Sequence, residues 1–233
     1  MGEQPATMEG ADFDSALIGA AFSIAAAEGW RRVSVAKAAR AAGLDLARAR
    51  LRFPNRISLL LRFGALADQA ALTGVDQEGP VRDRLFDMLM RRIDTFQSHR
   101  PGVLALFREL PLHPETSLLL IYETQRSMRW MLEGAGVSTT GLQGALFEHG
   151  LVGVWLWTLR AWQGDHTEDL TATMAALDDA LRRAESAARW LGAEETIGVA
   201  EDRAEREPGP DTTLVQAPPP PAPPEPPASP PPV

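Results

Sequence analysis

Residues 34–63, SVAKAARAAGLDLARARLRFPNRISLLLRF, decide the fold of this chain, because each helix boundary within them has a local cause. Ser34 is a good N-cap for a helix that follows it, and Gly43 supplies a tight turn. Asp45 then caps a short helix over 46–52. Two short helices joined by a tight glycine turn are typical of a helix-turn-helix DNA reader.

The segments on either side extend this pattern into a larger helical unit. Phe53-Pro54-Asn55 ends the short helix, and Asn55 caps a second helix that runs from Arg56 to about Ala71. Upstream, an apolar stripe predicts a helix over 13–28 that Gly29 ends. We therefore expect a helical head in which the short helix over 46–52 contacts DNA.

Charge is concentrated in this head. Nine of the 23 Lys and Arg residues lie between positions 31 and 62 with one acid, Asp45, so this stretch carries +8; the whole chain carries −8, so the rest sums to −16. The nine are Arg31, Arg32, Lys37, Arg40, Arg48, Arg50, Arg52, Arg56 and Arg62. A basic patch on an acidic protein favours a phosphate backbone as its partner.

The rest of the chain also predicts helices, because no alternating β pattern occurs in it. Helices are expected near 35–42, 81–98, 101–110, 115–134, 140–163 and 168–191, which makes nine in an all-α protein. The expected organisation is a disordered leader (1–12), a helix-turn-helix DNA-binding domain (13–71), a helical effector-binding and dimerisation domain (80–191) and a disordered acidic, Pro-rich tail (192–233).

Composition excludes several classes of protein. Without cysteine there are no disulfides or thiolate zinc sites, and the four histidines lack metal-ligand spacing, so we expect no metal. There is no Gly-rich phosphate loop and no nucleophile elbow, so we expect neither catalytic residues nor a cofactor. The acidic N-terminus is not a secretory signal, and no run of about 18 uncharged apolar residues indicates a spanning helix. A cytoplasmic protein without stable membrane insertion is expected.

A helical wheel of 46–52 gives a first assignment of the DNA contacts. Leu46, Ala49 and Phe53 share its inner face, whereas Arg48 and Arg52 lie on the opposite face and Arg50 sits near the inner edge. We expect Arg48 to contact a base edge or nearby phosphate and the other two arginines mainly phosphates. The predicted DNA-binding residues are Ser34, Lys37, Arg40, Asp45, Leu46, Ala47, Arg48, Arg50, Arg52 and Arg56.

The same residues resemble the TetR family of bacterial regulators. The resemblance covers the first helix, the Ala42-Gly43 turn, the third helix and the run from Phe53 to Leu60, which looks like the family's Phe-Pro-x-Lys-x-x-Leu element with Arg56 in place of Lys. The chain departs from the family at Arg50, where a Tyr is usual, at Arg48, usually small and polar, and at Asp45, often Ser or Thr. The resemblance implies a homodimeric repressor that binds a palindromic operator in duplex DNA and is released by a small apolar effector.

A second resemblance gives an alternative function. Trp162, Asp165 to Leu170, Thr173 and Leu177-Asp178 loosely resemble a TetR-folded branch that binds lipid as an accessory protein of ubiquinone biosynthesis, with a degenerate DNA head. The very basic head favours the regulator. A bare interaction module with the Pro-rich tail as its working part also stays open.

Two further sets of residues are predicted in the body, each against the alternative of ordinary core packing. One set would line a pocket for the effector, with lipid- and quinone-like compounds among the candidates. It comprises Phe107, Tyr122, Met128, Met131, Phe147, His149 and Trp155. The dimer interface would use Leu151, Trp155, Leu159, Trp162, Leu177, Leu181 and Ala184.

Overall fold

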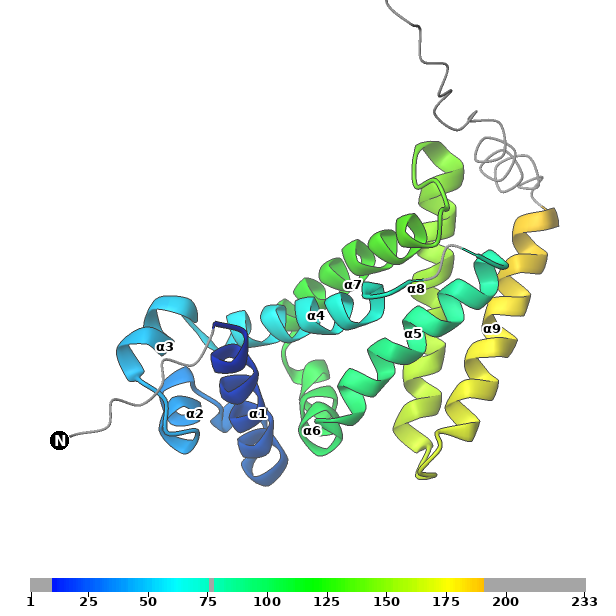
Figure 1. Cartoon of the computed structure of the whole chain (residues 1–233). Helices are drawn as coiled ribbons and strands as arrows, with labels where there is room; N and C mark the ends of the chain where they lie inside the picture. Colours follow the sequence, from blue (N-terminus) through cyan, green and yellow to red (C-terminus); the bar gives the residue numbers. More distant parts are fainter. Residues whose placement is uncertain (1–9, 76–77, 191–233) are drawn as a thin grey trace, which may run out of the picture.

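The computed structural model describes residues 10–75 and 78–190, and in these ranges it contains nine α-helices, two 3-10 helices and no strand (Figure 1). The elements are α1 (Gly10–Glu28), η1 (Trp30–Arg32), α2 (Val35–Ala41), α3 (Leu46–Arg52), α4 (Arg56–Leu72), α5 (Val81–Gln97), α6 (Arg100–Glu109), η2 (Leu110–Leu112), α7 (Pro114–Gly134), α8 (Gly141–Gly164) and α9 (Thr171–Trp190). The prediction of an all-α protein is confirmed.

Two boundaries differ from the expected ones by more than one residue. α1 begins at Gly10, so residues 10–12 belong to the helix and not to a leader. α9 begins at Thr171 instead of 168, because the Asp165 carboxylate organises the preceding turn. It accepts hydrogen bonds from the backbone N–H groups of Thr167 at 3.1 Å and Thr173 at 2.8 Å, and the Thr167 hydroxyl is the largest cause of its pKa being far below the ordinary value. The predicted tail, 192–233, lies outside the described residues.

The head is built around α1. Its Phe13, Leu17, Ile18 and Phe22 are buried against α2, α4 and α6, and each such burial contributes about 1.5–3 kcal/mol. Of the described helices, α1 is the one long and apolar enough to cross a membrane by length and composition. Its buried side chains and the ion pairs of Asp14 are those of a core helix.

The long helix α4 leads from the head into the body, where it packs along α5 and α7 (Figure 1). α8 and α9 form an antiparallel pair at the far side, and α5 packs against α9. The buried side chains of the body include Met88 and Ile93 of α5, Met128 of α7 and Trp155 of α8. The body is therefore a set of packed helices, and α4 and α6 connect it to α1 of the head.

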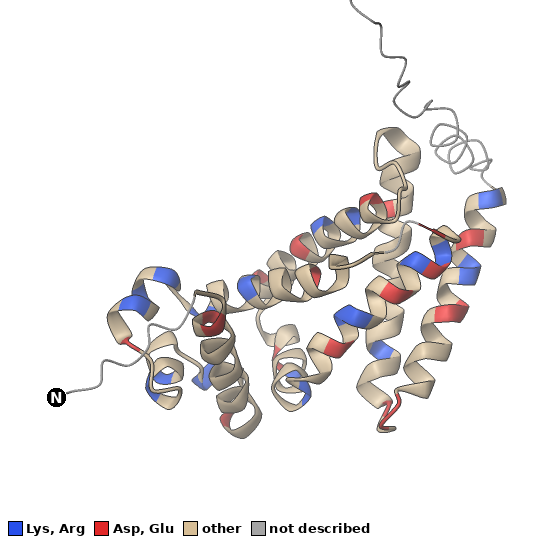
Figure 2. Ribbon diagram, in the orientation of Figure 1, with Lys and Arg blue, Asp and Glu red and all other residues tan. Residues whose placement is uncertain are grey.

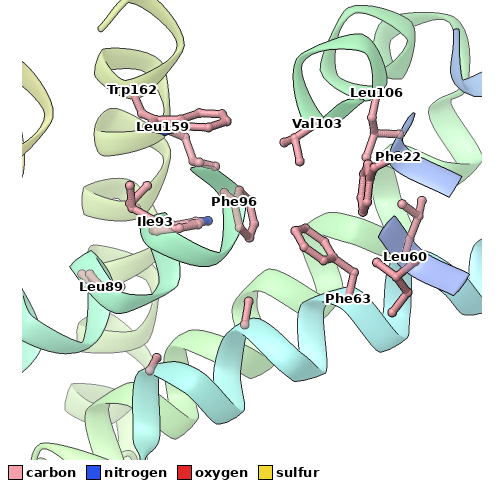
Figure 3. Packing of buried hydrophobic residues seen from close by; sticks show 14 of the residues in the cluster. Phe22, Leu60, Phe63, Leu89, Ile93, Phe96, Val103, Leu106, Leu159 and Trp162 are labelled. Carbon is pink, nitrogen blue, oxygen red and sulfur yellow. The ribbon is translucent and has the colours of Figure 1, made fainter. Parts of the chain in front are cut away.

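Aromatic rings run without a break from the head into the body. The ring centroid of Phe63 lies 4.6 Å from that of Phe22 and 5.2 Å from that of Phe96, which in turn lies 5.5 Å from Trp155. Figure 3 shows Phe63 and Phe96 facing each other across this joint. His99 stacks on Phe22 at 5.4 Å, and burial lowers its pKa. Head and body therefore share one core.

Helix α6 makes the closest contact with the head. A Cβ atom at Gly102 would lie 2.3 Å from the carbonyl oxygen of Phe22, so only glycine allows the backbones of α6 and α1 to approach this far. At the other end of α6, Glu109 accepts a hydrogen bond of 3.0 Å from the backbone N–H of Arg31. α6 thus fixes both the middle of α1 and the start of η1.

Candidate nucleic-acid interface

The turn between α2 and α3 forms as the sequence predicts. The Ser34 hydroxyl accepts from the N–H of Lys37 at 3.1 Å and begins α2, and Gly43 adopts a positive φ of 65°. The Asp45 carboxylate accepts from the N–H of Arg48 at 2.7 Å and begins α3. The predicted bounds of α3, 46–52, are confirmed.

Helix α4 begins with a reciprocal cap. The Asn55 side chain accepts from the N–H of Ser58 at 3.0 Å, and the Ser58 hydroxyl accepts from the N–H of Asn55 at 3.4 Å. Phe53, buried in the head core, ends α3 two residues earlier. These contacts fix the orientation of α3 on the head surface.

The predicted wheel of α3 is partly wrong. Ala49 and Phe53 are buried as expected, but Leu46 is 43% exposed and Leu51 is 86% exposed. Of the exposed residues of α3, Arg52 is paired with Asp14 of α1, and the remaining four, Leu46, Ala47, Arg50 and Leu51, form what we call the outward face of α3. With Ala49 and Phe53 buried, Arg48 and Arg52 lie against α1, whereas Arg50 donates to the carbonyl of Pro54.

Arg48 and Arg52 lie on this α1 side and not on the far face that the wheel assigned to them. The guanidinium carbon of Arg48 lies 4.4 Å from the ring centroid of Phe13, a cation–π contact. The Nε and Nη2 atoms of Arg52 donate to the two carboxylate oxygens of Asp14, each at 2.7 Å. Arg52 therefore holds α3 against α1.

Asp14 joins three helices, because it also accepts from Arg62 of α4 at 2.8 Å. Burial by itself raises the pKa of this carboxyl group, but hydrogen bonds and charge from Arg52 and Arg62 outweigh it and hold the pKa below the ordinary value. The same ion pair raises the pKa of Arg52. Sequence reasoning missed Asp14, although its position four residues before buried Ile18 places it on the inner face of α1.

The remaining cations of the head are divided between internal partners and solvent. Lys37 pairs with Glu28 of α1 at 2.6 Å, and Arg56 donates to the carbonyl of Arg31 at 3.4 Å. Arg40 is exposed on α2. Figure 2 shows the blue residues gathered over α2 and α3, whereas the body helices carry red and blue together. The basic patch is therefore real but smaller than the charge count suggested.

The residues predicted to line one effector pocket lie in four different settings. A cavity of about 660 Å³, which we call the central cavity, lies between α4, α5, α6, α7 and α8, and Phe107 and Trp155 line it. Phe147 instead lines a second cavity of about 760 Å³, formed by the start of α5 and the ends of α7 and α9 against α8. Met128 and Met131 are fully buried core residues.

The two polar residues predicted for the pocket lie on the surface. Tyr122 is 62% exposed on α7, and His149 is exposed on α8 with its Nδ1 2.6 Å from the carbonyl of Ala145. Neither residue lines either of the two cavities, because the sequence pattern alone does not say which side of α7 or α8 faces the interior.

The central cavity has a polar group that sequence reasoning missed. Arg92 of α5 is buried, pairs with Asp68 of α4 at 2.5 Å and also contacts Ser127 of α7. Its guanidinium carbon lies 4.8 Å from the ring centroid of Trp155. Burial lowers the pKa of Arg92, while Asp68 opposes this effect. The signal in the sequence is one arginine within the apolar stripe of α5.

The predicted dimer residues are occupied within the protomer. All but Ala184, which is half-buried, are buried, and they pack α8 and α9 against each other and against the rest of the body. They therefore do not form a free interface. The exposed face of α8 carries a different set of residues, namely Leu142, Leu146, His149, Gly150, Gly153, Leu156 and Trp157.

Comparison with known proteins supports the fold. No protein-family model and no curated protein matches the chain. Among solved structures, it is similar to a TetR transcriptional regulator from Nitrosomonas europaea (TM-score 0.63, 19% identity, covering 75% of this chain and 98% of that one). It is also similar to a TetR-family transcriptional regulator from Streptomyces coelicolor (TM-score 0.56, 20% identity, covering 88% and 93%). The chain therefore has a TetR-like fold.

Proposed function

We propose that this protein is a cytoplasmic DNA-binding transcriptional regulator that acts as a homodimeric repressor and is released from its operator by a small apolar effector. The observation that carries the proposal is the presentation of α3. This helix stands on the surface of a helix-turn-helix head with exposed Leu46, Ala47, Arg50 and Leu51 pointing away from the core, and Arg40 flanks it on α2. Two solved structures with a similar fold are described as transcriptional regulators, which supports the proposal.

A dimer would form through the exposed face of α8. Leu146 is 48% exposed and Trp157 is 54% exposed, so this face has unpartnered apolar surface. A Cβ atom at Gly150 or Gly153 would meet nothing within 4 Å, so a neighbouring helix has room to approach closely there. A two-fold pair doubles the DNA contact and sets the spacing of the half-sites.

The effector would occupy the central cavity. Its volume of about 660 Å³ suits a drug-sized apolar molecule. α4 and α6 both line this cavity and both pack against α1 of the head. An effector that favours one arrangement of these two helices would therefore change the spacing of the two heads, and the coupling equals its difference in affinity for the two arrangements.

The test is a titration of the full chain with a random-sequence duplex pool at several salt concentrations, followed by sequencing of the bound fraction. We expect a palindromic enriched site and an affinity that falls steeply with salt, because phosphate contacts release counterions. Binding without any enriched sequence contradicts the proposal. Sedimentation of the free protein gives the oligomeric state in the same buffers.

A lipid-binding accessory protein is the second candidate, and two observations favour it. The chain has two large apolar cavities, and the outward face of α3 exposes Leu46 and Leu51 while Arg48 and Arg52 are turned toward α1. Organic extraction of the purified protein, followed by mass spectrometry, tests this candidate directly. Stoichiometric lipid together with no enriched DNA sequence would select it over the regulator.

A further inference from the structure

The outward face of α3 combines one guanidinium group, that of Arg50, with apolar side chains. Of the three arginines in this helix, Arg48 lies over Phe13 and Arg52 is held by Asp14, whereas Arg50 is exposed and contacts no residue of α1 in these interactions. Leu46 precedes Arg50 by one helical turn, and Leu51 follows it directly with 86% of its surface exposed. Ala47 adds little bulk to this face.

We propose that Arg50 is the residue of this interface that reads a base, that the base is guanine, and that Leu46 and Leu51 contact the methyl groups of neighbouring thymines. The inference rests on the proposed function, since it requires that α3 enters the major groove. It replaces the assignment of base reading to Arg48 with one derived from the orientation of the helix.

The chemistry of the major groove supports this assignment of partners. Guanine presents two acceptors, O6 and N7, to the planar fork of an arginine, and thymine presents an apolar methyl group. Arg50 has five N–H groups, and its hydrogen bond to the carbonyl of Pro54, at 3.2 Å, uses one of them. Leucine side chains have no hydrogen-bonding group, so among base edges the thymine methyl is their natural contact.

The spacing along α3 fits neighbouring base pairs. Leu46 and Arg50 are four residues apart, which corresponds to about 6 Å along the helix axis. Consecutive base pairs are about 3.4 Å apart, so this distance spans about two of them. We therefore expect each half-site to contain a guanine with a thymine no more than two base pairs away on either side.

The test compares selected sites for the wild type, Arg50→Ala and Leu51→Ala, with Arg40→Ala as the control for a phosphate contact. All three altered side chains are exposed, so the variants should melt at the wild-type temperature. Arg50→Ala should reduce the preference for one guanine by about 5- to 150-fold, the range for a bidentate pair. Arg40→Ala should weaken binding to all sequences equally.

DNA with modified bases tests the proposed contacts of Arg50 with guanine and of Leu51 with thymine. Replacing that guanine with 7-deazaguanine removes N7 and should weaken wild-type binding about tenfold, because a hydrogen bond to a charged group is lost. The same replacement should leave Arg50→Ala unchanged. Replacing thymine with uracil removes the methyl group, and should cost the wild type about three- to fourfold but cost Leu51→Ala nothing.

The outcomes separate this inference from the proposed function. If the wild type selects a site and Arg50→Ala selects the same site with equal preference, the inference is overturned while the regulator stands. If the wild type selects no site, both are overturned. If, in that case, Leu51→Ala abolishes binding to phosphatidylglycerol vesicles, the outward leucines of α3 contact lipid instead of DNA.

Discussion

Asp14 of α1 and Arg52 of α3 are joined by two hydrogen bonds of 2.7 Å, so a buried carboxylate fixes α3 against α1. Arg62 of α4 donates to the same carboxylate at 2.8 Å. Three helices of the head therefore share one ionic junction. Two of the nine basic residues in the patch, Arg52 and Arg62, therefore hold the helices of the head together.

Replacing Asp14 with Asn should lower the free energy of unfolding by about 1–3 kcal/mol, because a buried partner of two arginines loses its charge while the arginines stay half-solvated. Chemical denaturation monitored by circular dichroism gives this value. Asp12→Asn is the matched control, since Asp12 is an exposed acid on the same helix. Equal stability of the two variants contradicts the role given to the junction.

The junction should also respond to acid. The pKa of Asp14 is lower in the folded protein than its ordinary value of 3.8, so its contribution is complete above that value and is lost as the pH falls through the lower, folded pKa. Unfolding curves of the wild type and Asp14→Asn should therefore converge as the pH drops below 3.8. A difference that stays constant down to pH 2 would show that the carboxylate charge is not its origin.

Gly102→Ala should destabilise the joint between α6 and α1 by about 1–3 kcal/mol, because the new methyl group would lie 2.3 Å from the Phe22 carbonyl oxygen and the two helices would have to separate. Gly64→Ala is the control, as a helical glycine of α4 with nothing within 4 Å of the added Cβ. That variant should gain about 0.5–1 kcal/mol from reduced chain entropy. Thermal unfolding of both variants measures the contrast, which fails if they shift in the same direction.

His99 should make stability depend on pH near neutrality. Burial lowers its pKa below 6.5, so the folded state keeps the neutral ring and loses stability as the pH falls from 6.5 toward the folded pKa. The melting temperature of the wild type should decline over this interval, and His99→Gln should decline less. His166→Gln, at an exposed position, should retain the wild-type profile.

The exposed cation Arg40 should contribute to DNA affinity through phosphate alone. Arg40→Ala should reduce the slope of log K against log salt by about 1, with no change in the selected sequence. Fluorescence anisotropy with a labelled duplex at four salt concentrations measures the slope. Arg183→Ala, on α9 of the body, should leave it unchanged.

The exposed face of α8 should determine the oligomeric state. Trp157→Asp places a charge on the apolar stripe beside Gly153 and should shift the sedimentation coefficient from dimer to monomer, because a buried unpaired carboxylate is costly. Leu118→Asp introduces the same charge at an exposed position of α7 and should leave the dimer intact. A dimer that survives Trp157→Asp would place the interface elsewhere.

The helical elements themselves were accessible from the sequence, because their boundaries depend on neighbouring residues. Ser34, Asp45 and Asn55 each accept from a backbone N–H three residues later, and Gly43 takes the positive φ that a tight turn needs. Such interactions are local, so reading the chain in order was enough to find the turn and the short α3. The all-α class follows from the same local signals.

The rotation of each helix about its own axis was decided only by tertiary structure. A wheel gives the angles between side chains, but the inner face is set by the neighbouring helices that bury it. Where apolar residues lie on several sides, as on α8, the pattern fits more than one rotation, and Trp155 faces the core while Trp157 faces solvent. In α3, Arg52 binds the buried Asp14 of α1, 38 residues away in sequence, whereas Arg50 stays exposed and donates to the carbonyl of Pro54. The sequence by itself determined which segments are helical, and packing determined which residues those helices offer to a partner.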